Sequence, residues 1–248
     1  MSDDAHKYVY GVVPASAAAP ARAGIGGAAV ETIASDATAA IVSDVAEGDL
    51  EAGREELMIH AQVLEQALEG GVVLPMRFGA VMADADSVRH ELLERHHDAL
   101  MSQLAELEGK VELRVRAVFE ETALMSEIVR ENPEIAALRE ALHGQDDDAT
   151  YYERIRLGEL VAAAVEGKRE AEAQEILDAL APLALAVDTG DLGHERVALN
   201  ASFLVARERI AEFDEAVDEI GRAREGRMRL KYTGPLPAHS FVELSVEG

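Results

Sequence analysis

One segment near the middle of the chain sets the strongest limit on the fold. Residues 110–119 read Lys-Val-Glu-Leu-Arg-Val-Arg-Ala-Val-Phe and alternate apolar and polar side chains almost without a break. Successive side chains of a strand point to opposite faces, so this pattern predicts a strand with one face on a core. The chain must therefore contain a sheet with a buried face.

The elements that follow this strand define an ordered unit. Apolar periodicity and breaker residues predict helices at 121–130, 133–142, 151–180 and 207–224, and strands at 183–187, 195–206 and 226–232. From Gly109 onward the order is therefore β-α-β-β-α-β, with extra helix inserted after the first strand. This is the ferredoxin-like order.

The N-terminal part has a different order. Strands are predicted at 6–13, 30–34, 40–45 and 72–78, and helices at 51–69 and 84–107. Chains of 248 residues tend to divide into two cores. We therefore predict an α+β fold with two domains, residues 1–108 and the ferredoxin-like residues 109–248, the latter ending in an extended tail from about residue 233.

Composition narrows the class of protein. With 48% hydrophobic residues the chain can bury a core, and the absence of Cys excludes disulfides, thiolate metal sites and cysteine nucleophiles. The first seven residues are acidic where a signal peptide would be basic, and no apolar run approaches the ~20 residues that span a bilayer. These features predict a cytoplasmic protein.

The formal charge of −25 is the most unusual bulk property. It makes binding to nucleic acid or to an anionic membrane unfavourable, so neither is an expected partner. Acids outnumber bases by 48 to 23. A GC-rich genome would favour Arg and Ala, whereas a high-salt cytoplasm would screen the repulsion between acids. Both explanations remain open.

Signals for a cofactor or metal are weak. The sequence lacks a Walker-type phosphate loop, and Gly24–Gly27 has neither the spacing nor the context of a dinucleotide site. His90, His96 and His97 lie close together among carboxylates, but adjacent residues of a helix point about 100° apart. We therefore interpret these histidines as a solvated helix face and predict no cofactor and no metal.

Signals for catalysis are equally weak. His239, Ser240 and Glu243 have the residue types of a triad, but neighbours on an extended segment face alternate directions, and triads are defined by geometry. Carboxylates are so abundant that a catalytic pair chosen from the sequence would be a coincidence of composition. No catalytic residue is predicted, and we expect a protein that is not an enzyme.

Five collinear segments carry a family resemblance. They are Tyr8–Val13, Val73–Gly79, Leu107–Leu113, Leu199–Val205 and Leu230–Pro237. Together they resemble the gas vesicle protein L/F family over nearly the whole chain. In that family a Gly-Pro-X-Pro motif is usually followed by a further Pro, an aromatic residue, Ser and Phe. Here Ala238 and His239 replace the Pro and the aromatic residue.

The resemblance implies a function and a set of motif residues. It implies a two-domain α+β assembly protein that binds the gas vesicle shell protein and other accessory proteins, in the cytoplasm and at the gas vesicle. The residues it singles out, as a partner-binding or a structural motif, are Pro75, Arg77, Phe78, Gly79, Gly234, Pro235, Pro237 and Phe241. The alternative is a ferredoxin-like protein that binds or converts a small ligand, because that fold hosts many functions.

Overall fold

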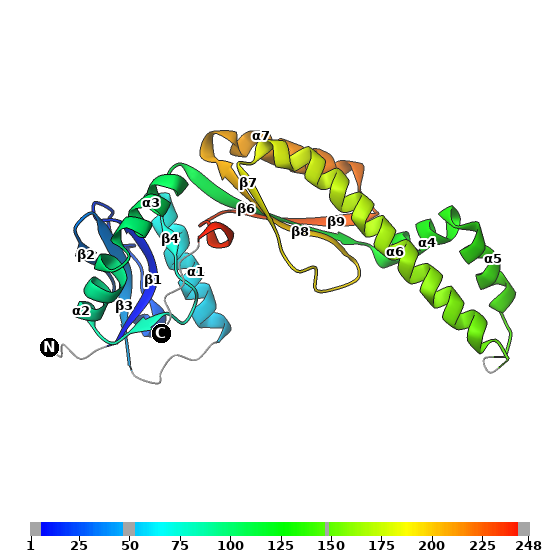
Figure 1. Cartoon of the computed structure of the whole chain (residues 1–248), viewed down its shortest axis with the longest axis horizontal. Helices are drawn as coiled ribbons and strands as arrows, with labels where there is room; N and C mark the ends of the chain where they lie inside the picture. The colour runs from blue at the N-terminus through cyan, green and yellow to red at the C-terminus, as the bar shows by residue number, and fades with distance from the viewer. Residues whose placement is uncertain (1–5, 47–52, 147–148, 243–248) are drawn as a thin grey trace. The chain divides into compact units, whose positions relative to one another are not determined.

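The computed structural model describes residues 6–46, 53–146 and 149–242 (Figure 1). The chain forms two compact units, each with a sheet and helices. The first unit comprises residues up to Glu112 together with residues from Gly234 onward, and the second spans Leu113–Thr233. The sequence predicts a boundary near residue 109 and assigns residues 234–248 to the second domain. The structure instead groups the residues from Gly234 onward with the first unit.

The first unit is built on a five-stranded sheet with β1 near its centre. Its strands are β1 (His6–Pro14), β2 (Val30–Ser35), β3 (Thr38–Val45), β4 (Leu74–Pro75) and β5 (Val81–Met82). The order is β2-β3-β1-β4, and β5 also pairs with β1. Only Leu74 and Pro75 of the predicted strand 72–78 form β4, because proline has no N–H to donate to the hydrogen bonds between strands. Strand β5 is not predicted from the sequence.

The helices of the first unit are α1 (Arg54–Glu69), α2 (Ala85–Ser87) and α3 (His97–Leu107), with a π-helical turn at Val88–Glu94 between the last two. Asp84 caps α2, since its carboxylate accepts from the Ser87 N–H at 2.7 Å. We predicted one continuous helix over 84–107. The Arg95 N–H instead donates to His90 O five residues earlier, which breaks the regular α-helical ladder.

The second unit has a four-stranded sheet covered by helices. Its strands are β6 (Lys110–Phe119), β7 (Ala186–Thr189), β8 (Val197–Ala206) and β9 (Met228–Leu236), in the order β7-β8-β6-β9. Strand β9 continues past the predicted end at Tyr232. It can include Pro235 because β9 is an edge strand, where a missing donor is tolerated.

The helices of the second unit are α4 (Glu121–Glu131), α5 (Pro133–Leu142), α6 (Tyr151–Leu180) and α7 (Ile210–Ala223). In α7, Phe213 lies 5.2 Å from Phe203 of β8 and 6.1 Å from Tyr232 of β9, between ring centroids. Helices α6 and α7 run along the same face of the sheet (Figure 1). None of the helices among the described residues is long and apolar enough to cross a membrane.

A buried ionic network joins α4, α6 and the start of β9. Arg227 donates to Glu127 of α4 at 3.0 Å and to Glu172 of α6 at 2.7 Å. Arg224 donates to Glu172 at 2.8 Å, and Lys168 lies 2.8 Å from Glu127. Hydrogen bonding to Arg227 lowers the pKa of Glu127 to about 2. The network therefore keeps Glu127 ionised and ties α4 to the rest of the second unit.

Candidate functional site

The motif Pro75–Gly79 lies against an aromatic cluster in the first unit. Pro75 pairs with Gly11 of β1, and the Phe78 ring lies 6.0 Å from the Tyr8 ring. The Gly79 N–H donates to the Tyr8 hydroxyl at 3.2 Å. Gly79 has a φ of +92°, which residues with a Cβ rarely adopt. Glycine thus allows the backbone turn that presents this N–H to Tyr8.

A buried histidine completes the aromatic cluster. His60 of α1 is only 5% exposed, and its ring centroid lies 5.7, 5.7 and 5.8 Å from those of Tyr8, Tyr10 and Phe78. Its Nδ1 shares a hydrogen bond of 2.8 Å with the Tyr8 hydroxyl. Burial lowers the pKa of His60 to about 4, and the charge of His239 acts in the same direction. His60 is therefore neutral near pH 7.

We expect His60 to make the protein sensitive to mild acid. The unfolded chain binds a proton near the ordinary pKa of 6.5, whereas folded His60 does so only near 4. Stability should therefore fall as the pH drops from 6.5 towards 4. The free energy of unfolding, measured with urea, should fall between pH 7 and pH 5 in both proteins. The fall should be about 1 to 2 kcal/mol larger for the natural chain than for His60→Gln. Equal losses in both proteins would contradict this assignment.

The C-terminal motif begins in a strand and ends in a buried turn. Gly234 and Pro235 lie in β9 and are exposed, whereas Pro237 and Ala238 are buried. Phe241 ends a single 3-10 turn and is half-buried. The departure from the family motif at Ala238 therefore falls at a buried position, where a small side chain is accommodated.

Ser240 anchors this turn to the first unit. Its N–H donates to Glu112 Oε2 at 2.7 Å, and its hydroxyl donates to Glu112 Oε1 at 3.0 Å. Glu112 is fully buried. The Ser240 hydroxyl is thus bonded to a carboxylate of β6 that is not part of the triad considered from the sequence. Glu243, the third residue of the triad that we considered, lies outside the described residues.

The structure brings the two predicted motifs together at His60. Phe78 contacts its ring, and His239 is close enough for its charge to depress the pKa of His60. Arg77 is exposed and makes no ion pair with any acid in the described ranges. The histidines considered as metal ligands lie elsewhere. His90 Nδ1 is 2.8 Å from Glu94 Oε2 on an exposed face, and the part of the chain described here contains no three-residue metal cluster.

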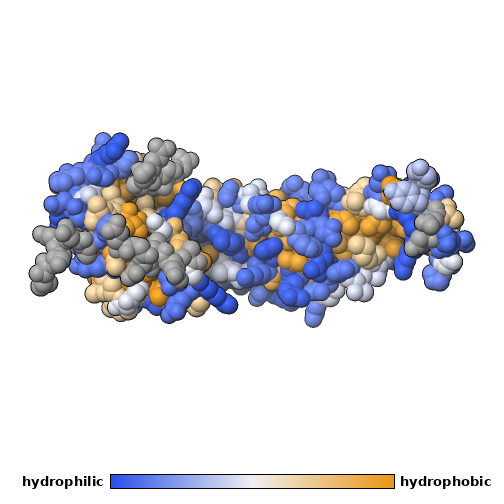
Figure 2. Space-filling model, turned by 90° about the horizontal axis from the view of Figure 1, so that it is seen from below, coloured by the Kyte–Doolittle hydropathy of each residue, from blue (hydrophilic) through white to orange (hydrophobic). Residues whose placement is uncertain are grey.

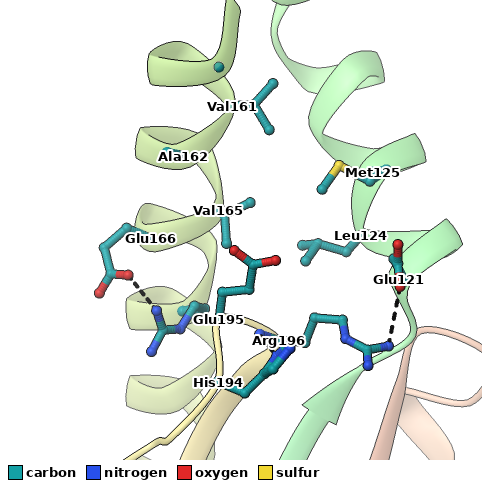
Figure 3. Close-up of a pocket in the computed structure, with 12 residues that line it drawn as sticks. Glu121, Leu124, Met125, Val161, Ala162, Val165, Glu166, His194, Glu195 and Arg196 are labelled. Atoms are coloured by element: carbon teal, nitrogen blue, oxygen red, sulfur yellow. Dashed lines mark hydrogen bonds and ion pairs between the residues drawn. The ribbon is translucent and has the colours of Figure 1, made fainter.

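A second candidate site is a groove between α4 and α6 in the second unit. It encloses about 520 Å³. Figure 3 shows apolar side chains from both helices facing each other across it. The apolar lining consists of Leu124 and Met125 from α4 and Val161, Ala162 and Val165 from α6. Because α4 and α6 do not fill the groove with their own side chains, its apolar lining is available to another molecule.

Charged side chains border the groove. Glu121 lies 3.5 Å from Arg196, a pair drawn in Figure 3, and Glu166 lies 2.6 Å from Arg169. These carboxylates are neutralised by neighbouring guanidinium groups. The border is therefore polar and the floor apolar, which is the anatomy of a protein-binding surface.

The apolar surface continues along α6 towards its first residue. Tyr151 and Ile155 are 60% and 43% exposed. They precede Gly158, Ala162 and Val165 at spacings of three or four residues, so the five share one helix face. Hydrophobic surface is visible over the helical end of this unit in Figure 2. The sequence predicts both helices but not this groove. The stripe of small and apolar residues on 151–165 is the signal that could have indicated it.

Comparisons with known proteins address the whole chain. The sequence model of the family described as gas vesicle synthesis protein GvpL/GvpF matches residues 6–243. The chain belongs to the GvpL/GvpF family. The match includes both motif segments, the His60 cluster and the groove. The predicted resemblance is thereby confirmed.

Individual members of the GvpL/GvpF family agree with this membership. Gas vesicle protein F from Streptomyces sp. (strain CB03234) is 40% identical over 240 residues, covering 95% of this chain and 99% of that protein. Gas vesicle protein F from Haloferax mediterranei is 27% identical over 250 residues, covering 99% and 96%. The crystal structure of GvpF from Anabaena sp. PCC7120 superposes with a TM-score of 0.85 at 25% identity, covering 97% of this chain and 99% of that one.

Proposed function

We propose that this chain is a non-catalytic assembly protein that binds the gas vesicle shell protein and other accessory proteins while vesicles form in the cytoplasm. Membership of the GvpL/GvpF family over residues 6–243 is the observation that carries this proposal. The shell protein is a small hydrophobic subunit, and apolar surface exposed to water promotes aggregation. A strongly charged partner that covers this surface would keep the subunit available for assembly.

The α4–α6 groove is the surface we assign to the shell protein. Its apolar floor matches the apolar face of a helix, a common mode of peptide recognition. Tyr151 and Ile155 extend the same face beyond the groove, and exposed Tyr is enriched among residues that dominate binding energy. The two charge pairs at the border orient a partner on the apolar floor.

We assign a structural role to the two sequence motifs. Pro75 pairs with Gly11 of β1, and Phe78 and Gly79 contact the Tyr8–His60 cluster. The C-terminal motif is anchored through Ser240 on Glu112. The exposed members, which are available to a partner, are Arg77, Gly79, Gly234 and Pro235. In this proposal the motif Gly234–Phe241 shapes the first unit and does not itself bind the shell protein.

The finer description of the fold is part of the same proposal. The sheet order β7-β8-β6-β9, with helices between β6 and β7 and between β8 and β9, supports a ferredoxin-like second domain. The helices α4 and α5 are its insertion. We also infer an F-type member, since a relative named protein F reaches 40% identity and one named protein L1 reaches 22%.

The alternative of a small-ligand-binding or catalytic protein predicts carboxylates that converge on one point of a pocket. In the groove, Glu121 and Glu166 are instead turned towards Arg196 and Arg169, so Glu195 is the one lining carboxylate without an ion pair among the described residues. This arrangement supports a protein-binding function.

The proposal is tested by vesicle formation. Met125→Glu with Ala162→Glu places two carboxylates in the groove, at positions that are exposed and helical. In a gas vesicle host that lacks its own copy of this gene, these substitutions should abolish buoyancy and vesicles in electron micrographs, because burying a charge without a partner is unfavourable. The matched control Met58→Glu with Ala99→Glu, on exposed helix positions of the first unit, should restore vesicles. Normal vesicles with the groove variant would refute the assignment.

A further inference from the structure

Four cations share one face of two neighbouring strands in the second unit. Arg114 and Arg116 of β6 are exposed and alternate with buried Leu113, Val115 and Ala117. Side chains two residues apart on a strand lie on the same face. The two arginines therefore point away from the face that the helices cover.

Strand β9 contributes two further cations to the same face of the sheet. Tyr232 stacks on Phe213 of α7, so the even-numbered residues of β9 face the helices. Arg229 and Lys231 alternate with them and are exposed. Because β6 and β9 are adjacent in the sheet, all four cations lie together on the helix-free face, which we term the basic face.

The four cations of the basic face differ in how they are paired. Arg229 pairs with Glu120 at 2.8 Å in an exposed position, and Arg114 Nε donates to Ser202 at 3.3 Å. Within the described ranges, Arg116 and Lys231 make no ion pair. Of the acids on this face, Glu112 of β6 accepts from Ser240, and Asp188 of β7 lies at the opposite edge of the sheet.

We propose that the basic face binds an acidic segment of a second protein in vesicle assembly. The inference deepens the proposed function by adding a second surface, with a different chemistry from the groove. Arg116 offers a planar guanidinium group that can pair bidentately with a carboxylate, and Lys231 offers a second positive charge beside it. A short acidic segment contacts mainly the local charge, because the field decays within about 8 Å at physiological ionic strength.

Nucleic acid fits the basic face less well. A long polyanion extends beyond the basic face and is repelled by the rest of the chain, whose net charge is −25. The strand positions 114, 116, 229, 231 and 233 carry no aromatic side chain on which bases could stack. The observations therefore favour an acidic polypeptide.

The test is binding of fluorescein-labelled decaglutamate to the full chain, measured by fluorescence anisotropy at low salt. The double variant Arg116→Glu/Lys231→Glu should bind it about tenfold or more weakly than the natural chain. The control Arg54→Glu/Arg95→Glu changes the net charge equally at exposed positions of the first unit and should bind normally. Thermal unfolding of each variant shows that it is folded.

Two further arms separate the possible outcomes. The groove variant Met125→Glu/Ala162→Glu should still bind decaglutamate, so a failure of the groove assignment and a failure of the basic face are distinguishable. A twenty-nucleotide oligothymidylate should bind more weakly than decaglutamate. Equal binding by both double charge variants, or tighter binding of the oligonucleotide, would overturn the proposal.

Discussion

Replacing Arg227 with Ala is expected to destabilise the protein by about 3 kcal/mol. Arg227 donates to Glu127 and Glu172, which are 6% and 7% exposed. Removing the guanidinium group leaves two buried carboxylates with fewer partners, although Lys168 and Arg224 remain beside them. The loss of stability comes mainly from the buried carboxylates that remain without a partner, and less from the attraction of the ion pairs that is lost.

Chemical unfolding at pH 7 measures this effect. Arg229→Ala is the matched control, because Arg229 is two residues away and pairs with Glu120 at the surface. Its side chain is 78% exposed, and exposed ion pairs contribute about 1 kcal/mol or less. Similar losses for the two variants would mean that the network does not hold α4 and α6 in the way described.

Glu112→Ala is expected to cost about 2 to 3 kcal/mol. Glu112 is fully buried and accepts from both the N–H and the hydroxyl of Ser240. The substitution removes this acceptor and leaves a cavity. We also expect the segment around Ser240 to exchange its amide hydrogens faster, since its anchor is lost.

Hydrogen exchange and urea unfolding measure these two effects. Glu106→Ala, an exposed acid four residues before the start of β6, should leave both unchanged. If Glu112→Ala unfolds like the natural chain and residues 237–241 keep their protection, the C-terminal motif is not anchored through Glu112.

Long periodic segments were the most predictable parts of the fold. Strand β6 and helix α6 have the predicted bounds, because alternation over ten residues is a strong signal and residues 151–180 are rich in Ala, Glu and Leu and contain no proline. The break in the helix 84–107 was not predictable, because a π-helical turn has no apolar pattern of its own. The length of β9 depends on its place at the sheet edge, which only the tertiary arrangement determines.

The sites were less predictable than the elements. Phe78 and Gly79 were singled out by resemblance, but their contacts with Tyr8 and His60 join residues up to 71 positions apart. Sequence periodicity carries no signal for such contacts. The groove depends on how α4 and α6 are spaced, and the basic face on the adjacency of β6 and β9. Both needed the tertiary structure.

The central claim is that the α4–α6 groove binds the gas vesicle shell protein. The most direct measurement is co-purification of the shell protein with the intact chain, in the salt of the native cell, compared with Met125→Glu/Ala162→Glu and with the control Met58→Glu/Ala99→Glu. We predict that the natural chain and the control retain the shell protein and that the groove variant binds it about a hundredfold more weakly. Equal recovery with the groove variant, or no recovery with the intact chain, would contradict the claim.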